Sequence, residues 1–319
     1  MKYLITYLTI FLFIWGYTYL MGATHTVNNT NDSGPGSLRQ AILNANSDLT
    51  SPRIINFAIA SGIQVITPLT ELPPLTASNV TIDGTTQPGW IAGHPVIVLS
   101  GSVSNFNFDG IVIDDTSNCT VQDIVINNGF LRGIMITNNT QDTHIYDCFI
   151  GTDQIGTHTS TNSVGIMVSA FGSNQNTNTA IGAPTHGNII SGNKYAGIFL
   201  TGNINNPTIQ SNKIGTDITG QIALPNTKVG IAIGTLPINT DVACDDTQIG
   251  GSTLSEGNII SGNGVGILTG FQPITDLTIT NNILGYNITG TQPIPNGKNI
   301  ISIESIAALT GLLLHNNIS

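Results

Sequence analysis

An identical hexapeptide occurs twice in the chain. Residues 188 to 193 read Asn-Ile-Ile-Ser-Gly-Asn, and the same six residues return 70 positions later, at 258 to 263. A Gly-Ile pair follows each copy and also occurs at other positions, and its glycines include Gly133, Gly165, Gly197, Gly230 and Gly266. The steps of 32, 32, 33 and 36 residues lie in the range of about 20 to 50 residues that is typical of repeat architectures.

Two kinds of repeat alternate along the chain. One kind carries Ile150-Gly-Thr-Asp153 or Ile214-Gly-Thr-Asp217, and the other carries the hexapeptide. Within each repeat the apolar residues form short alternating runs, separated by Asn, Gly, Ser and Thr, and this pattern favours strands over helices. Three short strands per repeat, stacked on those of the next repeat, predict an all-β solenoid, a parallel β-helix that spans residues 54–319 in about eight coils.

The composition excludes one large class of function. Only 8% of the residues are charged, and the formal net charge is −10 with a sequence pI of about 4.6. Nucleic-acid binding requires a basic patch, so we expect no nucleic-acid partner. The six histidines show no metal-ligand spacing, and no Ser-His-Asp order is evident; we therefore assign no catalytic residue, cofactor or metal.

The N-terminus has the pattern of an export signal. Lys2 precedes an apolar run that ends near Leu20, and the small residues Gly22 and Ala23 follow it. Residues 1–23 are thus interpreted as a secretory signal peptide. An uncleaved anchor is the alternative, because the run approaches the length that spans a bilayer. Both interpretations place the rest of the chain outside the cell or at its surface, with membrane contact only through this segment.

Residues 24–53 are predicted to form an N-terminal cap with one short helix. Ser37 and Gln40 form a capping-box pattern, and a helix over 38–46 would have one apolar face, made by Leu38, Ala41, Ile42 and Ala45. Such a helix covers the open strand edges of the first coil.

This segment and the repeats resemble the bacterial exported β-helix proteins of the CSLREA type. The resemblance is carried by Asn31-Asp-Ser-Gly-Pro-Gly-Ser-Leu-Arg-Gln-Ala-Ile42, by Val80-Thr-Ile-Asp-Gly-Thr-Thr-Gln-Pro-Gly89 and by the two repeat motifs. It covers nearly the whole chain after the signal segment, but the leading Cys is absent, since Gly36 precedes Ser37. The family implies a right-handed parallel β-helix in an extracellular or surface setting and implies no defined enzyme activity.

Several polar residues recur at equivalent places in the repeats. The asparagines that precede the Gly-Ile strands are predicted to form one hydrogen-bonded column, at Asn128, Asn162, Asn193, Asn226, Asn263 and Asn296. Asp153, Asp217 and Asn287 are interpreted as turn caps. Cys148 aligns with Asn212 and Asn282 and is expected to face the interior in a side-chain stack. The three cysteines are too few and too unevenly spaced for a disulfide framework.

Five residues are candidates for contact with a polyanion or a glycan. Arg132, Lys194, Lys228 and Lys298 occupy the same turn between the asparagine column and the Gly-Ile strand, so they should line one edge of the stack. The alternative is a purely structural role for these basic residues, because exposed turns accept lysine and charges at strand edges discourage aggregation. Trp90 beside Pro88 and Gly89 is able to stack on a sugar, or to pack on the first coil.

Two functional hypotheses follow from the sequence. The first is a non-catalytic exported or cell-surface scaffold, such as an adhesin or a carbohydrate-contact protein, whose partner is an extracellular or envelope polysaccharide. The second is a degenerate or unrecognised polysaccharide lyase or hydrolase of the pectin-lyase-like fold. They are distinguished by whether two or three acidic side chains from successive coils converge in a groove. Self-association through an open C-terminal coil is a further expectation, because an uncapped coil exposes strand edges.

Overall fold

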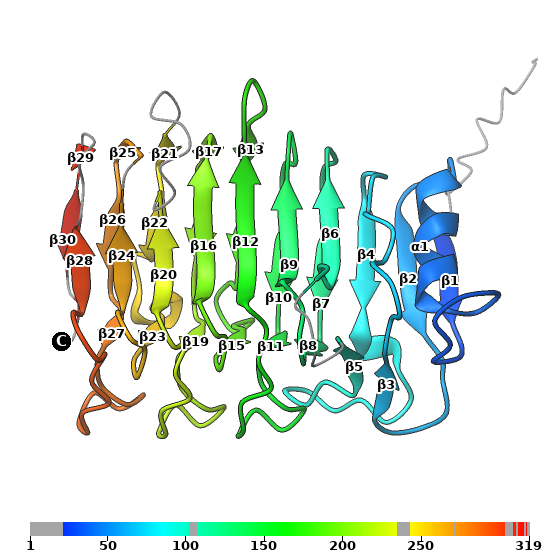
Figure 1. Cartoon of the computed structure of the whole chain (residues 1–319), viewed down its shortest axis with the longest axis horizontal. Helices are drawn as coiled ribbons and strands as arrows, with labels where there is room; N and C mark the ends of the chain where they lie inside the picture. Colours follow the sequence, from blue (N-terminus) through cyan, green and yellow to red (C-terminus); the bar gives the residue numbers. More distant parts are fainter. Residues whose placement is uncertain are drawn as a thin grey trace, which may run out of the picture.

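The computed structural model describes residues 22–101, 107–234, 243–270, 272–303, 309–310, 312–315 and 317. Its strands form four parallel sheets that run along one axis, and each strand of a sheet comes from a different coil (Figure 1). The parallel β-helix predicted from the repeats is confirmed. Stacked coils bury one continuous core that a single coil lacks, as in other repeat arrays.

Each sheet consists of strands that are neighbours in space but come from different coils. Sheet A has ten strands, in the order β1 (Ala23–Val27), β2 (Arg53–Phe57), β4 (Val80–Asp83), β7 (Thr120–Gln122), β10 (His144–Tyr146), β14 (Ala180–Ile181), β18 (Thr208–Ile209), β22 (Gln248–Gly250), β26 (Thr278–Thr280) and β30 (Leu313–His315). Sheet B has eight, β3 (Gln64–Ile66), β5 (Ile97–Ser100), β8 (Ile124–Asn127), β11 (Phe149–Ile150), β15 (Ile189–Ile190), β19 (Lys213–Ile214), β23 (Ile259–Ile260) and β27 (Ile283–Leu284).

The other two sheets complete each coil. Sheet C has seven strands, β6 (Ile111–Asp114), β9 (Arg132–Thr137), β12 (Val164–Ala170), β16 (Ala196–Gly202), β20 (Val229–Ile233), β24 (Ile267–Thr269) and β28 (Ile301–Ile303). The sequence predicts three strands per coil, but a fourth short strand follows sheet C in the later coils. These strands form sheet D, with β13 (Asn176–Thr177), β17 (Ile204–Asn205), β21 (Cys244–Asp245), β25 (Ile274–Thr275) and β29 (Leu309–Thr310).

The five glycines of the Gly-Ile pairs form the predicted column. A Cβ added to Gly133 would lie 2.8 Å from the carbonyl oxygen of Gly165, and the same contact repeats up the column, at 2.5 Å from Gly165 to Gly197 and 2.8 Å from Gly197 to Gly230. Such distances leave no space for a side chain. Glycine is therefore required at these positions, because the backbone of the next coil lies where a Cβ would be.

The predicted asparagine column exists from Asn193 onward, but Asn128 lies outside it and Asn162 is not bonded to Asn193. The Asn162 amide donates to Ile126 O at 2.9 Å, and Asn193 Oδ1 accepts no hydrogen bond within the described residues. Asn193, Asn226, Asn263 and Asn296 are joined by amide hydrogen bonds of 2.9, 2.9 and 3.2 Å. In the earliest coil Phe130 takes this place, since its backbone N–H donates to Asn162 Oδ1 at 3.4 Å. Asn128 is in a left-handed turn with φ of 65° and bonds to Ser100 instead. The column runs inside the turns that connect sheet B to sheet C.

A second asparagine column runs inside the turns that connect sheet A to sheet B. Asn188, Asn212, Asn258, Asn282 and Asn317 are joined by amide bonds of 2.9 to 3.2 Å. Cys148 begins this column, because its backbone N–H donates to Asn188 Oδ1 at 2.9 Å. The expected interior position of Cys148 is thus confirmed. All three cysteines are free and buried, as their number and spacing suggested.

The N-terminal cap contains the predicted helix and one strand that we did not anticipate. Helix α1 (Leu38–Ser47) buries its expected apolar face and packs on β1 and β2. Ser37 caps it by accepting from the N–H of Gln40. The Gln40 side chain bonds to Asn44 at 2.8 Å instead of completing the capping box. Strand β1 pairs with β2 and extends sheet A by one strand.

The predicted signal segment lies outside the described residues, apart from Gly22 and Ala23. Within the part of the chain that the structure describes, no helix has the length and hydrophobicity needed to cross a membrane.

Candidate functional site: a groove over sheet B and its acidic corner

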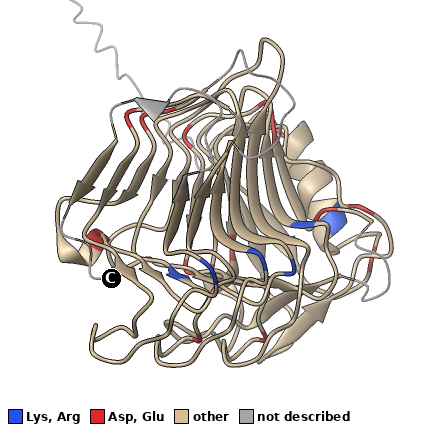
Figure 2. Cartoon of the chain, turned by 60° about the vertical axis from the view of Figure 1, so that its left-hand side comes forward, with Lys and Arg blue, Asp and Glu red and all other residues tan. Residues whose placement is uncertain are grey.

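The four basic candidate residues do not form one uniform strip. Lys194, Lys228 and Lys298 are exposed in the turns before sheet C, and Figure 2 shows a row of basic positions crossing the coils there. Ala196 pairs with Val229, so Lys194 is opposite position 227. Lys228 is therefore one residue out of register with Lys194. Arg132 lies at the start of β9 and forms an ion pair of 2.6 Å with Asp109, which is 4% exposed. The charge of Arg132 is therefore already neutralised inside the protein.

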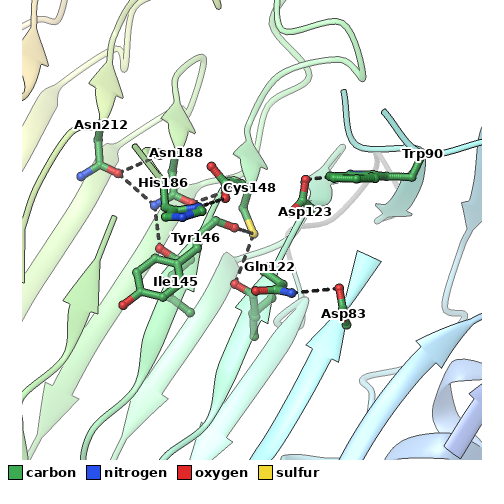
Figure 3. Close-up of polar contacts among 12 residues, drawn as sticks. Asp83, Trp90, Gln122, Asp123, Ile145, Tyr146, Cys148, His186, Asn188 and Asn212 are labelled. Carbon is green, nitrogen blue, oxygen red and sulfur yellow. Dashed lines mark hydrogen bonds and ion pairs between the residues drawn. The ribbon is translucent and has the colours of Figure 1, made fainter. Parts of the chain in front are cut away.

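Trp90 reaches across one coil to an aspartate. It follows the 3₁₀ helix η1 (Gly84–Thr86), is half-buried, and donates from Nε1 to Asp123 Oδ1 at 2.8 Å (Figure 3). This contact fixes the indole beside the turn that follows β7. Its role in sugar binding stays a prediction.

Asp123 is one of three aspartates that converge where sheet A turns into sheet B. Asp83, Asp123 and Asp147 come from coils whose strands β4, β7 and β10 are neighbours in sheet A. Asp123 and Asp147 occupy equivalent positions, in left-handed conformations with φ of 54° and 52°. Because neighbouring strands are about 4.8 Å apart, their backbones are separated by roughly that distance.

The three carboxylates have different partners. Asp83 accepts from Gln122 Nε2 at 2.9 Å, and Asp147 forms an ion pair of 2.7 Å with His186 Nδ1. Burial away from water raises the pKa of Asp123 to about 6, against the hydrogen bond from Trp90, and the charges of Asp147 and Asp83 add to the rise. The corner therefore holds one carboxyl that titrates in mildly acidic solution beside two that are bound to polar partners.

A groove of about 560 Å³ continues from this corner along the outside of sheet B. It extends from Asp147 to Asn281, which lie four coils apart, so its length is about 19 Å from four strand spacings. The floor includes Lys213, Ile259 and Ile283.

Loops from both ends of the sheet B strands form the walls of the groove. On the sheet A side, Thr185 lies in one loop and Leu254 and Ser255 in another, which contains the 3₁₀ helix η2 (Leu254–Glu256). That second loop is fixed to the coil before it, because Ser211 Oγ donates to the carbonyl oxygen of Ser255 at 2.6 Å. On the sheet C side the wall is made by Ile288 and Thr289.

The loops on the sheet C side are held by the predicted turn caps. Asp153 Oδ1 accepts from the N–H of Thr157 at 2.9 Å. Asp217 and Asn287 make the equivalent bonds, to Gln221 and Thr291 at 3.0 Å each. The interpretation of these residues as turn caps is confirmed.

The three loops also contact one another. The N–H of Ile218 donates to Gly156, and that of Ile288 to Gly220, both at 2.9 Å. They form a continuous wall although the coils that carry them are not adjacent.

The sequence contains a signal for the acidic corner. Val121-Gln-Asp-Ile-Val-Ile126 and Ile145-Tyr-Asp-Cys-Phe-Ile150 have the same pattern 24 residues apart, which aligns Asp123 with Asp147. The groove has no comparable signal, since its walls come from loops of different coils. Among the described residues, no group of three or more His, Cys, Asp or Glu is arranged to hold a metal ion.

Comparisons with known proteins find only distant similarity. No protein-family model matches the chain, and no curated protein matches it. Among solved structures, the alginate lyase from Paenibacillus sp. str. FPU-7 is 13% identical, with 92% of this chain and 99% of that chain covered and a TM-score of 0.43. PfbA, a surface adhesin of Streptococcus pneumoniae, is 11% identical, with 92% and 82% covered and a TM-score of 0.39. These values are too low to assign a function.

Proposed function

We propose that this protein is a non-catalytic, exported cell-surface scaffold of the CSLREA type that contacts carbohydrate through the groove over sheet B. The observation that carries the proposal is the groove itself, which has loops on both sides and extends across several coils. An extended chain of sugars is a ligand of matching shape. The volume of about 560 Å³ lies within the range of about 300 to 1,000 Å³ found for small-ligand sites.

The lining suits a sugar chain chemically. Sugars present hydroxyl groups at their edges and apolar C–H groups on their faces. The groove offers Ser211, Ser255 and Thr289 as hydrogen-bonding groups, and Ile259 and Ile283 as apolar surface. Trp90 and Tyr146 lie at the corner beyond its end, where aromatic rings support binding to sugar faces. An extracellular or envelope polysaccharide is the partner that this combination favours.

The first experiment is a glycan-array screen of the full chain with a groove-blocked variant. Leu254 lines the groove with 76% of its surface exposed, so Leu254→Trp obstructs it without disturbing the core. Leu49→Trp is the matched control, since Leu49 is 96% exposed and is absent from the groove lining. We expect glycan binding that Leu254→Trp removes and Leu49→Trp retains. Binding that survives in both variants would exclude the groove as the contact site.

A second candidate function is a degenerate or unrecognised polysaccharide lyase or hydrolase. The acidic corner favours it, because Asp123 and Asp147 come from successive coils with backbones about 5 Å apart, and retaining glycosidases hold two carboxyls about 5 to 5.5 Å apart. Release of reducing or unsaturated sugars that stops in Asp123→Asn but continues in Asp153→Asn, a change to a turn cap, would establish this function. The scaffold hypothesis predicts no release from any common polysaccharide.

A further inference from the structure

Lys213 interrupts an apolar column on the floor of the groove. The outward positions of sheet B pair in register from coil to coil, and Lys213 lies between Ile189 and Ile259. Its other column neighbours are apolar, namely Val98, Val125, Phe149 and Ile283. An aliphatic residue would continue this column. The methylene stem of a lysine does so too, but it also carries an ammonium group into the groove.

The ammonium group of Lys213 lacks the partners that the arginines have. Arg39 and Arg132 form ion pairs with Asp32 and Asp109, and Arg53 bonds to the carbonyl oxygens of Asp48 and Ser78. Within the described residues, no hydrogen bond or ion pair of the Lys213 ammonium is formed. Lys213 is half-buried, and burial lowers its pKa although the Asp217 charge acts in the opposite direction. A half-buried ammonium group that forms no hydrogen bond or ion pair is unfavourable.

We propose that Lys213 makes the groove selective for an acidic glycan by pairing with the carboxylate of a uronic acid residue. The inference rests on the proposed function, because it specifies the ligand of the same groove. A ligand carboxylate supplies the missing partner. One ammonium matches one carboxylate, and the other groove positions then take hydroxyl groups and apolar faces of the same chain.

The charge around Lys213 favours a singly charged group. Asp147 also lines the groove, Asp217 acts on Lys213, and the chain has a formal net charge of −10. Phosphate or densely sulfated sugars would bring more negative charge than one lysine neutralises. A uronate brings a single charge per sugar, and its planar carboxylate accepts charge-assisted hydrogen bonds.

The test compares a xylo-oligosaccharide that carries a single glucuronic acid residue with its carboxyl-reduced form, which has the same backbone without the charge. Titration calorimetry with the full chain is expected to show at least about tenfold tighter binding of the acid form, as a charge-assisted hydrogen bond implies. Lys213→Met should bind both forms equally, at the wild-type affinity for the reduced form. Lys228→Met, which removes an exposed turn lysine, is the matched control and should retain the preference.

The outcomes separate the two proposals. Equal binding of both forms by the wild-type protein, or a preference that persists in Lys213→Met, overturns the inference and leaves the glycan groove intact. Tighter binding of a sulfated analogue than of the uronate overturns the assignment to carboxylates. If neither this pair nor any glycan of the array binds the wild-type protein, the proposed function fails together with the inference. A preference lost in Lys228→Met would assign selectivity to the turn lysines instead.

Discussion

The inner asparagine column should carry a measurable part of the stability, and Asn226→Ala tests this. The Asn226 side chain accepts from the backbone and side-chain nitrogens of Asn193, at 3.1 and 2.9 Å. It donates to Ile190 O and to Asn263 Oδ1, both at 2.9 Å. The side chain is fully buried. Alanine removes all four bonds.

The expected cost follows from what remains after the substitution. Ile190 O still accepts from the N–H of Gly215 at 3.2 Å, and the Asn193 side chain still donates to Ile150 O at 3.2 Å. The backbone N–H of Asn193 loses its acceptor. A buried donor without a partner costs about 1 to 3 kcal/mol, and each net hydrogen bond about 1 kcal/mol. The unpaired donor and the three other lost bonds together imply a loss of about 4 to 6 kcal/mol in the free energy of unfolding.

Urea unfolding combined with native-state hydrogen exchange measures this loss. In a one-dimensional array the destabilisation should concentrate in the coils that contact the substituted one, so amide protection should fall first in β19 and β20. Asn128→Gly is the control, because Asn128 lies outside the column in a left-handed turn that glycine adopts readily. It should cost about 1 kcal/mol or less. Equal losses in both variants would refute the distinction between the column and the turn.

Three further predictions concern single groups. Lys213 should titrate at lower pH than an ordinary lysine in NMR spectra of the ¹³C-methylated protein, and an ordinary lysine titration would contradict this. The free energy of unfolding should rise as pH increases through the lowered pKa of Lys213, because the unfolded chain holds the proton more tightly. Asp123 should protonate near pH 6, as followed by Trp90 fluorescence. The raised pKa of Asp123 stabilises the protein at low pH, and this stabilisation is lost as pH rises through about 6. It amounts to about 1 to 2 kcal/mol in the free energy of unfolding after discounting for solvent screening. Asp123→Asn should abolish this pH dependence. Gly230→Ala places a Cβ 2.6 Å from Gly266 O and should cost about 1 to 3 kcal/mol in thermal or urea unfolding, whereas Gly297→Ala, whose nearest contact is 3.4 Å, should cost little.

The repeat pattern was sufficient to predict the architecture. The Gly-Ile spacing identified a column that depends on close approach of successive backbones, and this requirement is local and periodic. The turn caps followed for the same reason, since Asp217 acts within its own loop. The cap helix was also predictable, because Ser37 and the apolar face are neighbours in sequence. Features of this kind are determined within one coil.

Features that depend on register between coils were harder to predict. Asn128 precedes Gly133 by five residues, whereas Asn162 precedes Gly165 by three, and only the stacking shows that Phe130 takes the place in the column. The second asparagine column was noticed only through its alignment with Cys148. Sheet D was missed because its strands are two residues long, too short for a periodic pattern.

The candidate site was the least predictable part. Lys213 is one of eight basic residues. The amino-acid sequence around it does not show that its side chain faces outward between two isoleucines. The turn lysines were predicted as contact residues because they recur at equivalent places in the repeats. A binding residue needs to occur only once, so a repeat pattern does not reveal it. The groove becomes visible only when loops of several coils are placed around one strand.

The contacts among the three loops on the sheet C side limit how this chain can change in length. Each loop folds back on itself as a small hairpin, with Asp153 N–H bonded to His158 O and Asp217 N–H to Ile222 O, at 2.9 Å each. A hairpin is two strands thick, so it fills the spacing of two coils, about 9.6 Å. Removing a single coil would bring two hairpins into the space of one. Duplication or deletion should therefore proceed by two coils at a time, which is the 70-residue period of the repeated hexapeptide.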